Sequence, residues 1–211
     1  MEIKYVIGVD EVGRGPLAGP VTVGIVMVPC NFDWSLVKGV NDSKKLSEKR
    51  RQIINNRAHQ LQGLGKIKFV VIGSSAKTID KLGISVSIKR SVNRGLEKVL
   101  NLYREDNKQI TIDKTNVLVR LDGSLFASKK WINQETIIKG DSKDPLIGLA
   151  SIVAKVSRDD YMCRVSKQKD FSVYGFDKNK GYGTLYHRQA VKKNGLSSIH
   201  RVTYCKNIEL L

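Results

Sequence analysis

The sequence lacks any long apolar run. No stretch approaches the roughly 18 uncharged apolar residues that a membrane-spanning helix needs. The first residues, Met1-Glu2-Ile3-Lys4, also lack the basic leader and apolar segment of a secretory signal peptide. We therefore expect a cytoplasmic protein without a membrane partner.

Cysteine and histidine are scarce as well. The chain has 3 Cys and 3 His, and no two cysteines form a C-x-x-C pair. A disulfide framework or a zinc knuckle needs closely spaced cysteines, so neither is predicted. Reduced thiols are the default state in the cytoplasm. The sequence thus indicates no site for a soft metal ion.

Acidic residues are few relative to basic ones. The 211 residues include 37 Lys and Arg but 20 Asp and Glu, which gives a formal net charge of +17. Hydrophobic residues make up 41% of the chain, enough for one folded domain with a real core. A compact domain of this charge attracts polyanions, of which nucleic acid is the first candidate and an anionic membrane surface the second. Composition alone does not separate an enzyme from a passive binding protein.

The hydrophobic pattern predicts both strands and helices. Runs rich in β-branched residues predict strands at 5–9, 21–28, 67–72, 116–121 and 135–139. Apolar residues at helical spacing predict helices at 47–62, 84–103 and 185–194, and another that begins at Asp144-Pro145. Some strands are adjacent in the sequence and others are separated by helices. This order predicts an α/β domain with a mixed sheet.

Three of the predicted strands run into an aspartate. Asp10, Asp122 and Asp141 each follow an apolar run, and Glu11 adjoins the first. Strand ends are where α/β folds place their sites, so the four carboxylates could converge. Converging carboxylates repel one another, and a hard divalent cation such as Mg²⁺ relieves that repulsion. Two such ions about 4 Å apart would support in-line hydrolysis of a phosphodiester.

A structural interpretation of each acid stands beside the functional one. Aspartate after a strand is also a common turn residue and helix cap. Asp144 is better explained as the N-cap of the helix that Pro145 begins. Asp159 follows Arg158 within that helix, where a local ion pair is the ordinary role.

The glycine-rich bend after the first strand does not match a nucleotide-binding loop. Residues 13–18 (GRGPLA) fit the G-x-G-x-x-A spacing, but that fingerprint requires a helix to begin on the glycines. Prolines and a β-branched strand follow instead, and the Gly-Lys-Ser/Thr ending of a Walker A loop is missing. What remains is an exposed backbone that can approach a ligand, with Arg14 available for a phosphate.

Several blocks resemble one known family. Residues 10–21 (DEVGRGPLAGPV) resemble the signature of bacterial ribonuclease HII. The later blocks of that family resemble residues 41–46 (NDSKKL), 121–123 (LDG), 139–141 (KGD), 150–159 (ASIVAKVSRD), 174–176 (YGF), 180–184 (KGYGT) and 198–201 (SIHR). The blocks occur in order and cover nearly the whole chain.

The resemblance implies an RNase H-like fold with a mixed central β-sheet flanked by helices. It implies an endonuclease that cuts the RNA strand of RNA–DNA hybrids and incises 5′ of single ribonucleotides embedded in a DNA duplex. The products would carry 3′-hydroxyl and 5′-phosphate ends, in ribonucleotide removal and RNA primer processing. Two Mg²⁺ or Mn²⁺ ions would be held by Asp10, Glu11, Asp122 and Asp141, the set that also follows the predicted strands.

The resemblance also implies which residues bind substrate. The backbone of Gly13, Arg14 and Gly15 would read the ribose 2′-hydroxyl, the group that distinguishes RNA from DNA. Tyr182 would pack on the neighbouring sugar at the RNA–DNA junction. Phosphates would be held by Ser43, Lys44 and Lys45.

The C-terminal part of the chain is strongly basic. Residues 178–208 contain seven Lys and Arg and no Asp or Glu. A one-sided charge run that follows the Tyr182 segment indicates a duplex-binding appendage more than a merely solvated face. We therefore expect a catalytic domain at 1–175 and a small basic helical extension at 176–211 that contacts the duplex, in a monomeric protein.

The sequence departs from the family pattern at one place and leaves alternatives open. Val202-Thr203-Tyr204 replaces an Arg-Ser-Phe ending common in the family, which affects the expected C-terminal packing. The sister family, ribonuclease HIII, carries an N-terminal substrate-binding domain for which the nine residues before Asp10 leave no room. A non-catalytic nucleic-acid-binding protein on a degenerate nuclease fold is the main alternative. A nuclease or integrase of the same broad fold with another specificity is the nearer one.

Overall fold

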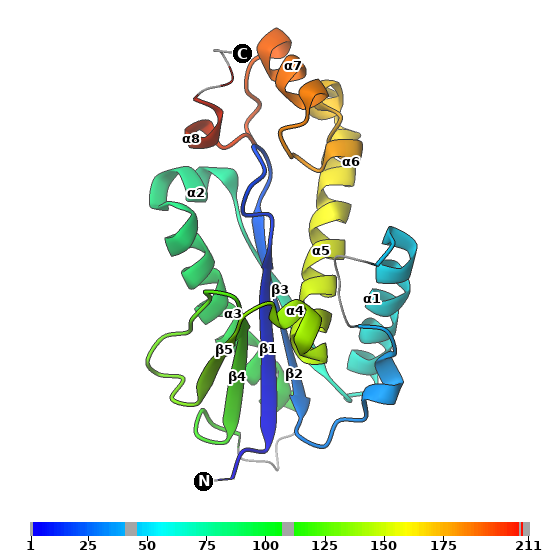
Figure 1. Cartoon of the computed structure of the whole chain (residues 1–211), viewed down its shortest axis with the longest axis vertical. Helices are drawn as coiled ribbons and strands as arrows, with labels where there is room; N and C mark the ends of the chain where they lie inside the picture. The colour runs from blue at the N-terminus through cyan, green and yellow to red at the C-terminus, as the bar shows by residue number, and fades with distance from the viewer. Residues whose placement is uncertain (1, 41–45, 107–111, 207, 209–211) are drawn as a thin grey trace.

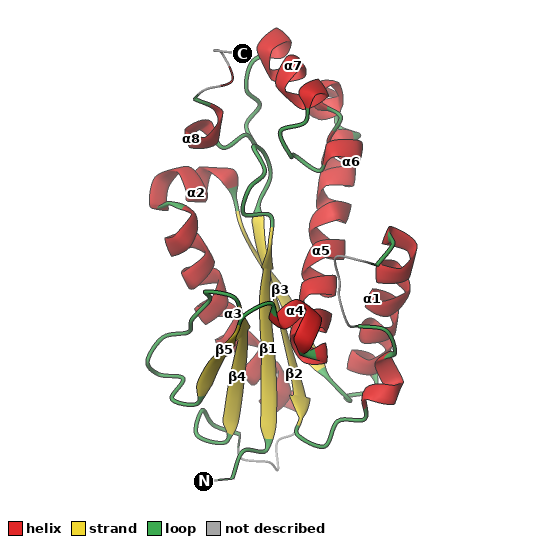
Figure 2. Cartoon of the chain, in the orientation of Figure 1, coloured by secondary structure: helices red, strands yellow, loops and turns green. Residues whose placement is uncertain are grey.

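A twisted sheet forms the centre of the protein. The computed structural model describes residues 2–40, 46–106, 112–206 and 208. Within them the sheet has five strands in the order β3-β2-β1-β4-β5, with β1 in the middle (Figures 1 and 2). The strands are β1 (Tyr5–Val12), β2 (Val21–Pro29), β3 (Lys68–Ser74), β4 (Val117–Asp122) and β5 (Gln134–Ile137).

The pairing makes the sheet mixed, as predicted. β1 pairs antiparallel with β2, and β2 pairs antiparallel with β3. β1 pairs parallel with β4, and β4 pairs parallel with β5. The chain thus begins as a meander and crosses over through two helices to β4 on the other side of β1. A loop at 123–133 then leads to β5, the second parallel strand.

The helices occupy both faces of the sheet and the end beyond β1 (Figure 1). The longer ones are α1 (Glu48–Gly63), α3 (Ile84–Asp106), α5 (Pro145–Ser166) and α7 (Leu185–Asn194). The shorter elements are η1 (Trp34–Val37), α2 (Ala76–Leu82), α4 (Gly140–Lys143), η2 (Lys169–Tyr174), α6 (Phe176–Asn179) and α8 (Val202–Cys205). Ser47, Thr184 and the predicted N-cap Asp144 each accept a hydrogen bond from the first turn of their helix.

Alternate residues of each strand face different helices. Val23 and Ile25 of β2 belong to the apolar cluster that contains α3. Val26 and Val28 belong to the cluster that contains α1 and α5. The strand period of two therefore divides the core into two layers, and both faces of the sheet are buried.

Two glycines let α5 lie unusually close to the sheet. A Cβ atom at Gly24 would come within 2.1 Å of the Ala150 carbonyl oxygen, and one at Gly8 within 2.6 Å of the Leu146 side chain. Both glycines point toward α5 because they share one face of β2 and β1. This close contact holds α5 beside the end of β1, where Asp10 lies.

A third apolar cluster joins the C-terminal elements to the rest. Met162 of α5, Phe176 of α6 and Val191 of α7 pack together with Ala18, which lies in the bend between β1 and β2. His200 forms an isolated β-bridge with Ala18. The basic C-terminal part of the chain therefore packs on the glycine-rich bend.

The structure corrects the predicted strand ends. β1 continues to Val12, so Asp10 and Glu11 lie within a strand and not after it, because Asp10 to Val12 still pair with β2. β5 ends at Ile137, before the predicted end at Lys139, and Asp141 lies in the first turn of α4. The short helices α2 and α8 were not predicted, since four to seven residues carry too little periodicity to be recognised.

Candidate active site

The register of the sheet brings Asp10 and Asp122 together. The last paired residues of β1 and β4 are Val9 and Leu121, so the two aspartates are the next residues on adjacent parallel strands. Both lie one residue beyond a side chain that faces α3, and therefore on the α5 face of the sheet. Adjacent strands are separated by about 4.8 Å, which places the two carboxylates side by side.

These aspartates line a cavity of about 390 Å³ at the end of the sheet. Glu11 and Val12 of β1 line it as well, with Gly13 from the following bend. The remaining lining residues come from α1, α5 and the segment before α7, and they are Arg51, Ser151, Lys155 and Tyr182. The cavity thus combines adjacent carboxylates with basic and aromatic side chains.

Burial and like charge make Asp10 reluctant to ionise. Its side chain is 5% exposed. Burial, opposed by a hydrogen bond with Ser151, and the nearby charges of Glu11 and Asp122 raise its pKa from 3.8 to about 8. A buried carboxylate in such surroundings is stabilised by a positive charge that the described protein atoms do not supply in full.

Glu11 is partly neutralised by Arg14. The Arg14 guanidinium lies 3.1 Å from Glu11 Oε1. Burial nevertheless raises the pKa of Glu11, against the hydrogen bond and charge of Arg14, and the charge of Asp122 raises it further. Glu11 Oε2 is buried and has no hydrogen-bond partner among the described residues. A buried, orphaned carboxylate oxygen beside Asp10 fits a hard divalent cation, which prefers oxygen ligands.

Asp141 is not one of the residues that line this cavity, but the residue before it contacts Asp122. Its side chain is 3% exposed, in the first turn of α4. The preceding residue, Gly140, donates its backbone N–H to Asp122 Oδ1 at 2.6 Å, which fixes the start of α4 against the end of β4. Lys139 turns the chain there with a positive φ of 57°, a conformation that is strained for a residue with a side chain.

The described residues do not form a complete metal centre. In the ranges that the structure describes, no group of three or more His, Cys, Asp or Glu side chains is arranged to hold a metal ion. Asp10, Glu11 and Asp122 line one cavity, and Asp141 follows the residue that donates its N–H to Asp122.

The backbone of the glycine-rich bend is held from inside by Arg201. This arginine is fully buried, and its guanidinium donates to the carbonyl oxygens of Gly13 at 2.6 Å, Arg14 at 2.7 Å and Gly19 at 3.1 Å. Burial, together with the charge of Arg158, lowers the pKa of Arg201 to about 10, so it stays charged at neutral pH.

Arg158 of α5 makes the same kind of contact with three other carbonyl oxygens. It is also fully buried and donates to the carbonyl oxygens of Pro20 at 2.9 Å, Ala18 at 3.2 Å and Lys180 at 2.9 Å. A Cβ atom at Gly13, whose φ is +91°, would come within 2.3 Å of Arg158 Nε. Only glycine therefore fits at position 13 while Arg158 stays in place.

Backbone hydrogen bonds also join the bend to the segment that carries Tyr182. Leu17 and Ala18 donate their backbone N–H groups to the Gly181 carbonyl oxygen, at 2.8 and 3.3 Å. The Tyr182 ring is 43% exposed, lines the acidic cavity and lies 5.8 Å from the Arg158 guanidinium carbon. We call residues 13–20 and 180–182, with Arg158 and Arg201, the loop cradle.

Sequence reasoning missed the residues that surround the carboxylates and support the loops. Ser151 and Lys155 are four residues apart on α5, and that helical spacing was a signal that could have found them. Lys155 pairs with Asp159 at 2.9 Å, so the partner of Asp159 is not Arg158 as expected. Arg51 of α1 donates to the Leu46 carbonyl oxygen and also lines the cavity.

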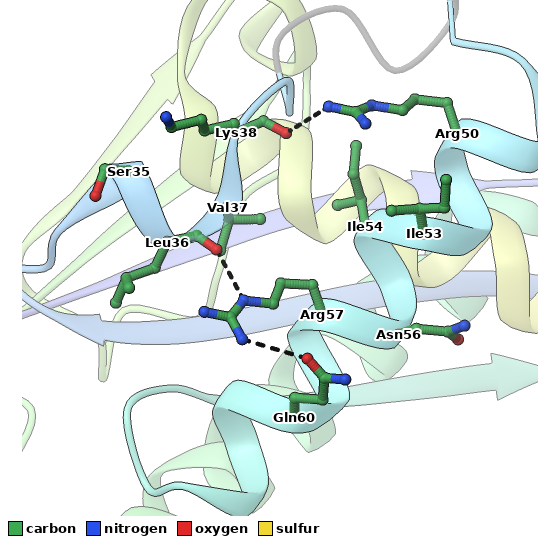
Figure 3. Close-up of a pocket in the computed structure, with 10 residues that line it drawn as sticks. All are labelled: Ser35, Leu36, Val37, Lys38, Arg50, Ile53, Ile54, Asn56, Arg57 and Gln60. Carbon is green, nitrogen blue, oxygen red and sulfur yellow. Dashed lines mark hydrogen bonds between the residues drawn. The ribbon is translucent and has the colours of Figure 1, made fainter.

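The residues expected to hold phosphates, Ser43, Lys44 and Lys45, lie outside the described residues. A cavity of about 430 Å³ lies between η1 and α1 (Figure 3). Arg57 donates to the Leu36 carbonyl oxygen at 3.0 Å, and Arg50 donates to that of Lys38 at 3.3 Å. Among the described residues that line this cavity none carries a carboxylate, and its arginines hold the backbone of residues 36–38.

None of the helices in the described part of the chain combines the length and apolar character needed to cross a membrane.

Comparison with known proteins identifies similar chains over nearly the full length. The family model of ribonuclease HII matches residues 7–207. The chain is 42% identical to a ribonuclease HII of Clostridium botulinum over 212 residues, covering 97% of this chain and 70% of the relative. It is 38% identical to a ribonuclease HII of Endomicrobium trichonymphae over 199 residues, covering 94% of this chain and 84% of the relative.

Solved structures share the fold. The ribonuclease H2 of Pyrococcus horikoshii OT3 superposes with a TM-score of 0.67 at 22% identity, covering 98% of this chain and 97% of that one. Bst-RNase HIII, solved in complex with Mn²⁺, superposes with a TM-score of 0.72 at 17% identity, covering 99% of this chain and 70% of that one. These similarities confirm the RNase H-like fold predicted from the sequence.

Proposed function

Because the chain belongs to the ribonuclease HII family of type 2 RNase H endonucleases, which act on RNA–DNA hybrids and depend on divalent metal ions, we propose that its acidic cavity cuts 5′ of a ribonucleotide. The substrates would include single ribonucleotides embedded in a DNA duplex, and the products would carry 3′-hydroxyl and 5′-phosphate ends. This activity would serve ribonucleotide removal and RNA primer processing. The placement of Asp10 and Asp122 directly after the last residues that pair β1 with β4, with a raised pKa at Asp10, is the observation that carries the proposal.

Asp10, Glu11 and Asp122 would hold the metal ions, joined by Asp141. The raised pKa of Asp10 and the orphaned Oε2 of Glu11 support this role, because both reflect negative charge without a sufficient counter-charge. Two bound Mg²⁺ or Mn²⁺ ions would supply an activated water and charge stabilisation at the departing 3′ oxygen. Asp141 would complete the set from the first turn of α4, the start of which is hydrogen-bonded to Asp122.

Basic side chains of the cavity would hold the phosphate next to the cleaved bond. Lys155 and Arg51 line the cavity from α5 and α1, together with the carboxylates. Each presents a cation to a phosphate that enters between them. Ser151 hydrogen-bonds Asp10 and thereby orients the carboxylate.

The backbone of residues 13–15 would read the 2′-hydroxyl. Arg158 and Arg201 draw carbonyl oxygens of the bend inward, so the other side of the peptide units turns outward. Among the described residues, the N–H groups of Arg14 and Gly15 have no acceptor. Outward N–H donors on a rigid loop suit a ribose hydroxyl oxygen, and Tyr182 would pack on the adjacent sugar.

The remaining expectations extend this proposal to the whole chain. The basic segment 176–211 would contact the duplex beyond the cavity, and Ser43, Lys44 and Lys45 would hold phosphates. The protein would act as a cytoplasmic monomer.

A cleavage assay on three labelled duplexes tests the proposal. One is a DNA duplex with a single ribonucleotide, one an RNA–DNA hybrid and one all DNA, each with Mg²⁺, Mn²⁺ or EDTA. We expect cleavage of the first two with either ion, none with EDTA and none of the all-DNA duplex. Binding without cleavage in every arm would favour the non-catalytic alternative, and cleavage of the all-DNA duplex would favour a nuclease of another specificity.

Tyr182→Ala tests the junction role separately. We expect a selective loss on the single-ribonucleotide duplex relative to the hybrid, because one junction contact is removed. Tyr186→Ala is the matched control, since Tyr186 is an exposed tyrosine that does not line the acidic cavity. Equal losses on both substrates in Tyr182→Ala would refute the junction role.

A further inference from the structure

A pair of buried histidines lies directly behind Tyr182. His187 of α7 is 0% exposed and His200 is 2% exposed. Their Nε2 atoms are 3.0 Å apart. His187 Nδ1 lies 2.9 Å from the Tyr182 carbonyl oxygen, and His200 Nδ1 lies 2.9 Å from the Ser197 backbone nitrogen. The four groups form one continuous chain of hydrogen bonds.

The two ends of this chain fix its direction. A backbone N–H can only donate, so His200 Nδ1 accepts from the Ser197 N–H and its ring proton lies on Nε2; the Ser197 hydroxyl, 2.7 Å from the same nitrogen, then also donates to it. A carbonyl oxygen can only accept, so His187 carries its proton on Nδ1 and donates to Tyr182. His200 Nε2–H then donates to His187 Nε2, and every group has one role. We call this chain the histidine relay.

We propose that His187 and His200 are positioning residues that set where Tyr182 stands at the acidic cavity, and thereby govern the preference for a single-ribonucleotide junction over a continuous hybrid. The proposal rests on the junction role of Tyr182 proposed above. Neither histidine lines the cavity, so both act through the Tyr182 backbone.

The relay requires both rings to be neutral. A protonated ring donates from both nitrogens. An added proton between the rings would set two N–H groups against each other, and one on His200 Nδ1 would face the Ser197 N–H and turn the Ser197 hydroxyl from donor to acceptor. Tyr174 and Phe176 pack against both rings, and the Tyr174 hydroxyl donates to the Gly195 carbonyl oxygen. Burial lowers the pKa of His187, and burial together with the neighbouring ring lowers that of His200 to about 4.

The turn at Tyr182 does not need the relay in order to form. The Tyr182 carbonyl oxygen also accepts the Thr184 N–H at 2.8 Å, and the Tyr182 N–H donates to the Asn179 carbonyl oxygen at 2.8 Å. The local backbone bonds therefore make the turn, and His187 adds a fixed anchor on α7. Loss of that anchor should change the placement of the ring more than the fold.

Two amide substitutions of His187 separate the two ends of the relay. In His187→Asn the amide nitrogen takes the place of Nδ1 and can still donate to Tyr182, but the link to His200 is lost. In His187→Gln the amide lies at the place of Nε2 and keeps the link to His200, but the donor to Tyr182 is lost. Both remove the aromatic ring, so each controls for the other.

The measurement is kcat/KM on the single-ribonucleotide duplex divided by kcat/KM on the hybrid. We expect His187→Gln to lower this preference about fivefold, the size of one lost hydrogen bond, and His187→Asn to keep it within about twofold. In a Tyr182→Ala background His187→Gln should lower it no further, because its effect passes through Tyr182. Equal preferences in the two His187 variants, or a further fall in the double variant, would overturn the relay's role.

Nitrogen NMR of the wild-type rings tests the relay without substrate. We expect His187 protonated on Nδ1 and His200 on Nε2, with both rings neutral at pH 6. The opposite tautomers, or a cationic ring at pH 6, would overturn the proposal even if the variants fail to fold. A wild-type preference in Tyr182→Ala overturns the junction role of Tyr182. A strong loss in Tyr182→Ala with equal His187 variants overturns only the relay.

Discussion

The acidic cavity and the loop cradle treat charge in opposite ways. In the cavity, Asp10 and Asp122 lie side by side, and Glu11 Oε2 has no partner among the described residues. In the cradle, Arg158 and Arg201 each give three hydrogen bonds to backbone carbonyl oxygens. Buried polar groups are left short of partners in the first region and are fully used in the second.

This difference separates binding of a cation from recognition of a shape. Uncompensated carboxylates are costly in the protein alone and become favourable when a divalent ion joins them. A backbone held by two rigid guanidinium groups is already in its binding conformation, so substrate need not order it. The stability of the cavity therefore depends on the ion that it binds, whereas the conformation of the cradle does not depend on a bound ligand.

Removing a carboxylate should break the cavity and leave the cradle intact. We expect Asp10→Asn to lower cleavage by roughly 10³-fold or more, since a neutral amide is a poor ligand for a metal ion. Binding of the uncleaved duplex should be kept or improved. Rates on the single-ribonucleotide duplex and affinities from a gel shift check both parts.

The same variant should be more stable than the wild type without metal. Asp10 has a folded pKa of about 8 against 3.8, so its penalty to folding grows as the pH rises between these values. Metal-free Asp10→Asn should melt above the wild type at pH 8 and close to it at pH 4. Asp160→Asn, on the exposed side of α5, is the control, and its rates should match the wild type. Near wild-type cleavage by Asp10→Asn would refute the site.

Shortening a cradle arginine should break the cradle and leave the carboxylates in place. Lysine keeps the charge of Arg201 but has a single ammonium group. It cannot reach all three carbonyl oxygens that the planar guanidinium group of Arg201 binds. We expect Arg201→Lys to lower the free energy of unfolding by about 3 kcal/mol, measured with urea. Arg90→Lys on the exposed face of α3 should be neutral. Equal stabilities of the two variants would show that the fork geometry contributes nothing.

The sequence predicted the cavity better than the cradle for a physical reason. Asp10 and Asp122 could be found because neighbouring strand ends meet wherever two parallel strands pair. Asp141 could not be placed, because the end of β5 and the left-handed turn at Lys139 depend on tertiary contacts. Arg158 and Arg201 bind carbonyl oxygens 138 to 188 residues away in the chain, and Arg158 binds another that is 22 residues away. Backbone acceptors leave no trace in a sequence. Arg158 was therefore assigned to its neighbour Asp159.

Acid should destabilise the cradle through the histidine relay. The folded pKa of His200 is about 4 against 6.5, so the unfolded chain binds the proton more readily. Neutral His200 contributes fully to the free energy of unfolding above pH 6.5. This free energy should fall by roughly 2 to 3 kcal/mol as the pH drops toward 4. His200→Gln cannot titrate, so its difference from the wild type isolates this loss in urea titrations. His59→Gln, at an exposed histidine, should keep the wild-type slope, and a similar slope in His200→Gln would contradict the prediction.

The smallest expected effect concerns an anchor outside the cradle. Asp80 of α2 accepts the backbone N–H groups of Val202 at 2.9 Å and Thr203 at 3.0 Å, and so caps α8 immediately after Arg201. Burial would raise the pKa of Asp80, but the hydrogen bonds from Thr203 and Val202 outweigh it and lower the pKa. Val202 and Thr203, which depart from the family ending, are thus held in place by a carboxylate on another element.

Asp80→Ala should lower the free energy of unfolding by about 1 kcal/mol, the usual contribution of a helix N-cap. This loss should disappear as the pH falls through the folded pKa of Asp80, because the protonated carboxyl accepts poorly. Lys77→Ala on the exposed face of α2 is the matched control. The preference between substrates should not change, because Arg201 already fixes the loop from inside. A changed preference would show that the cradle is not rigid without its outer anchor, and the contrast with the cavity would fail.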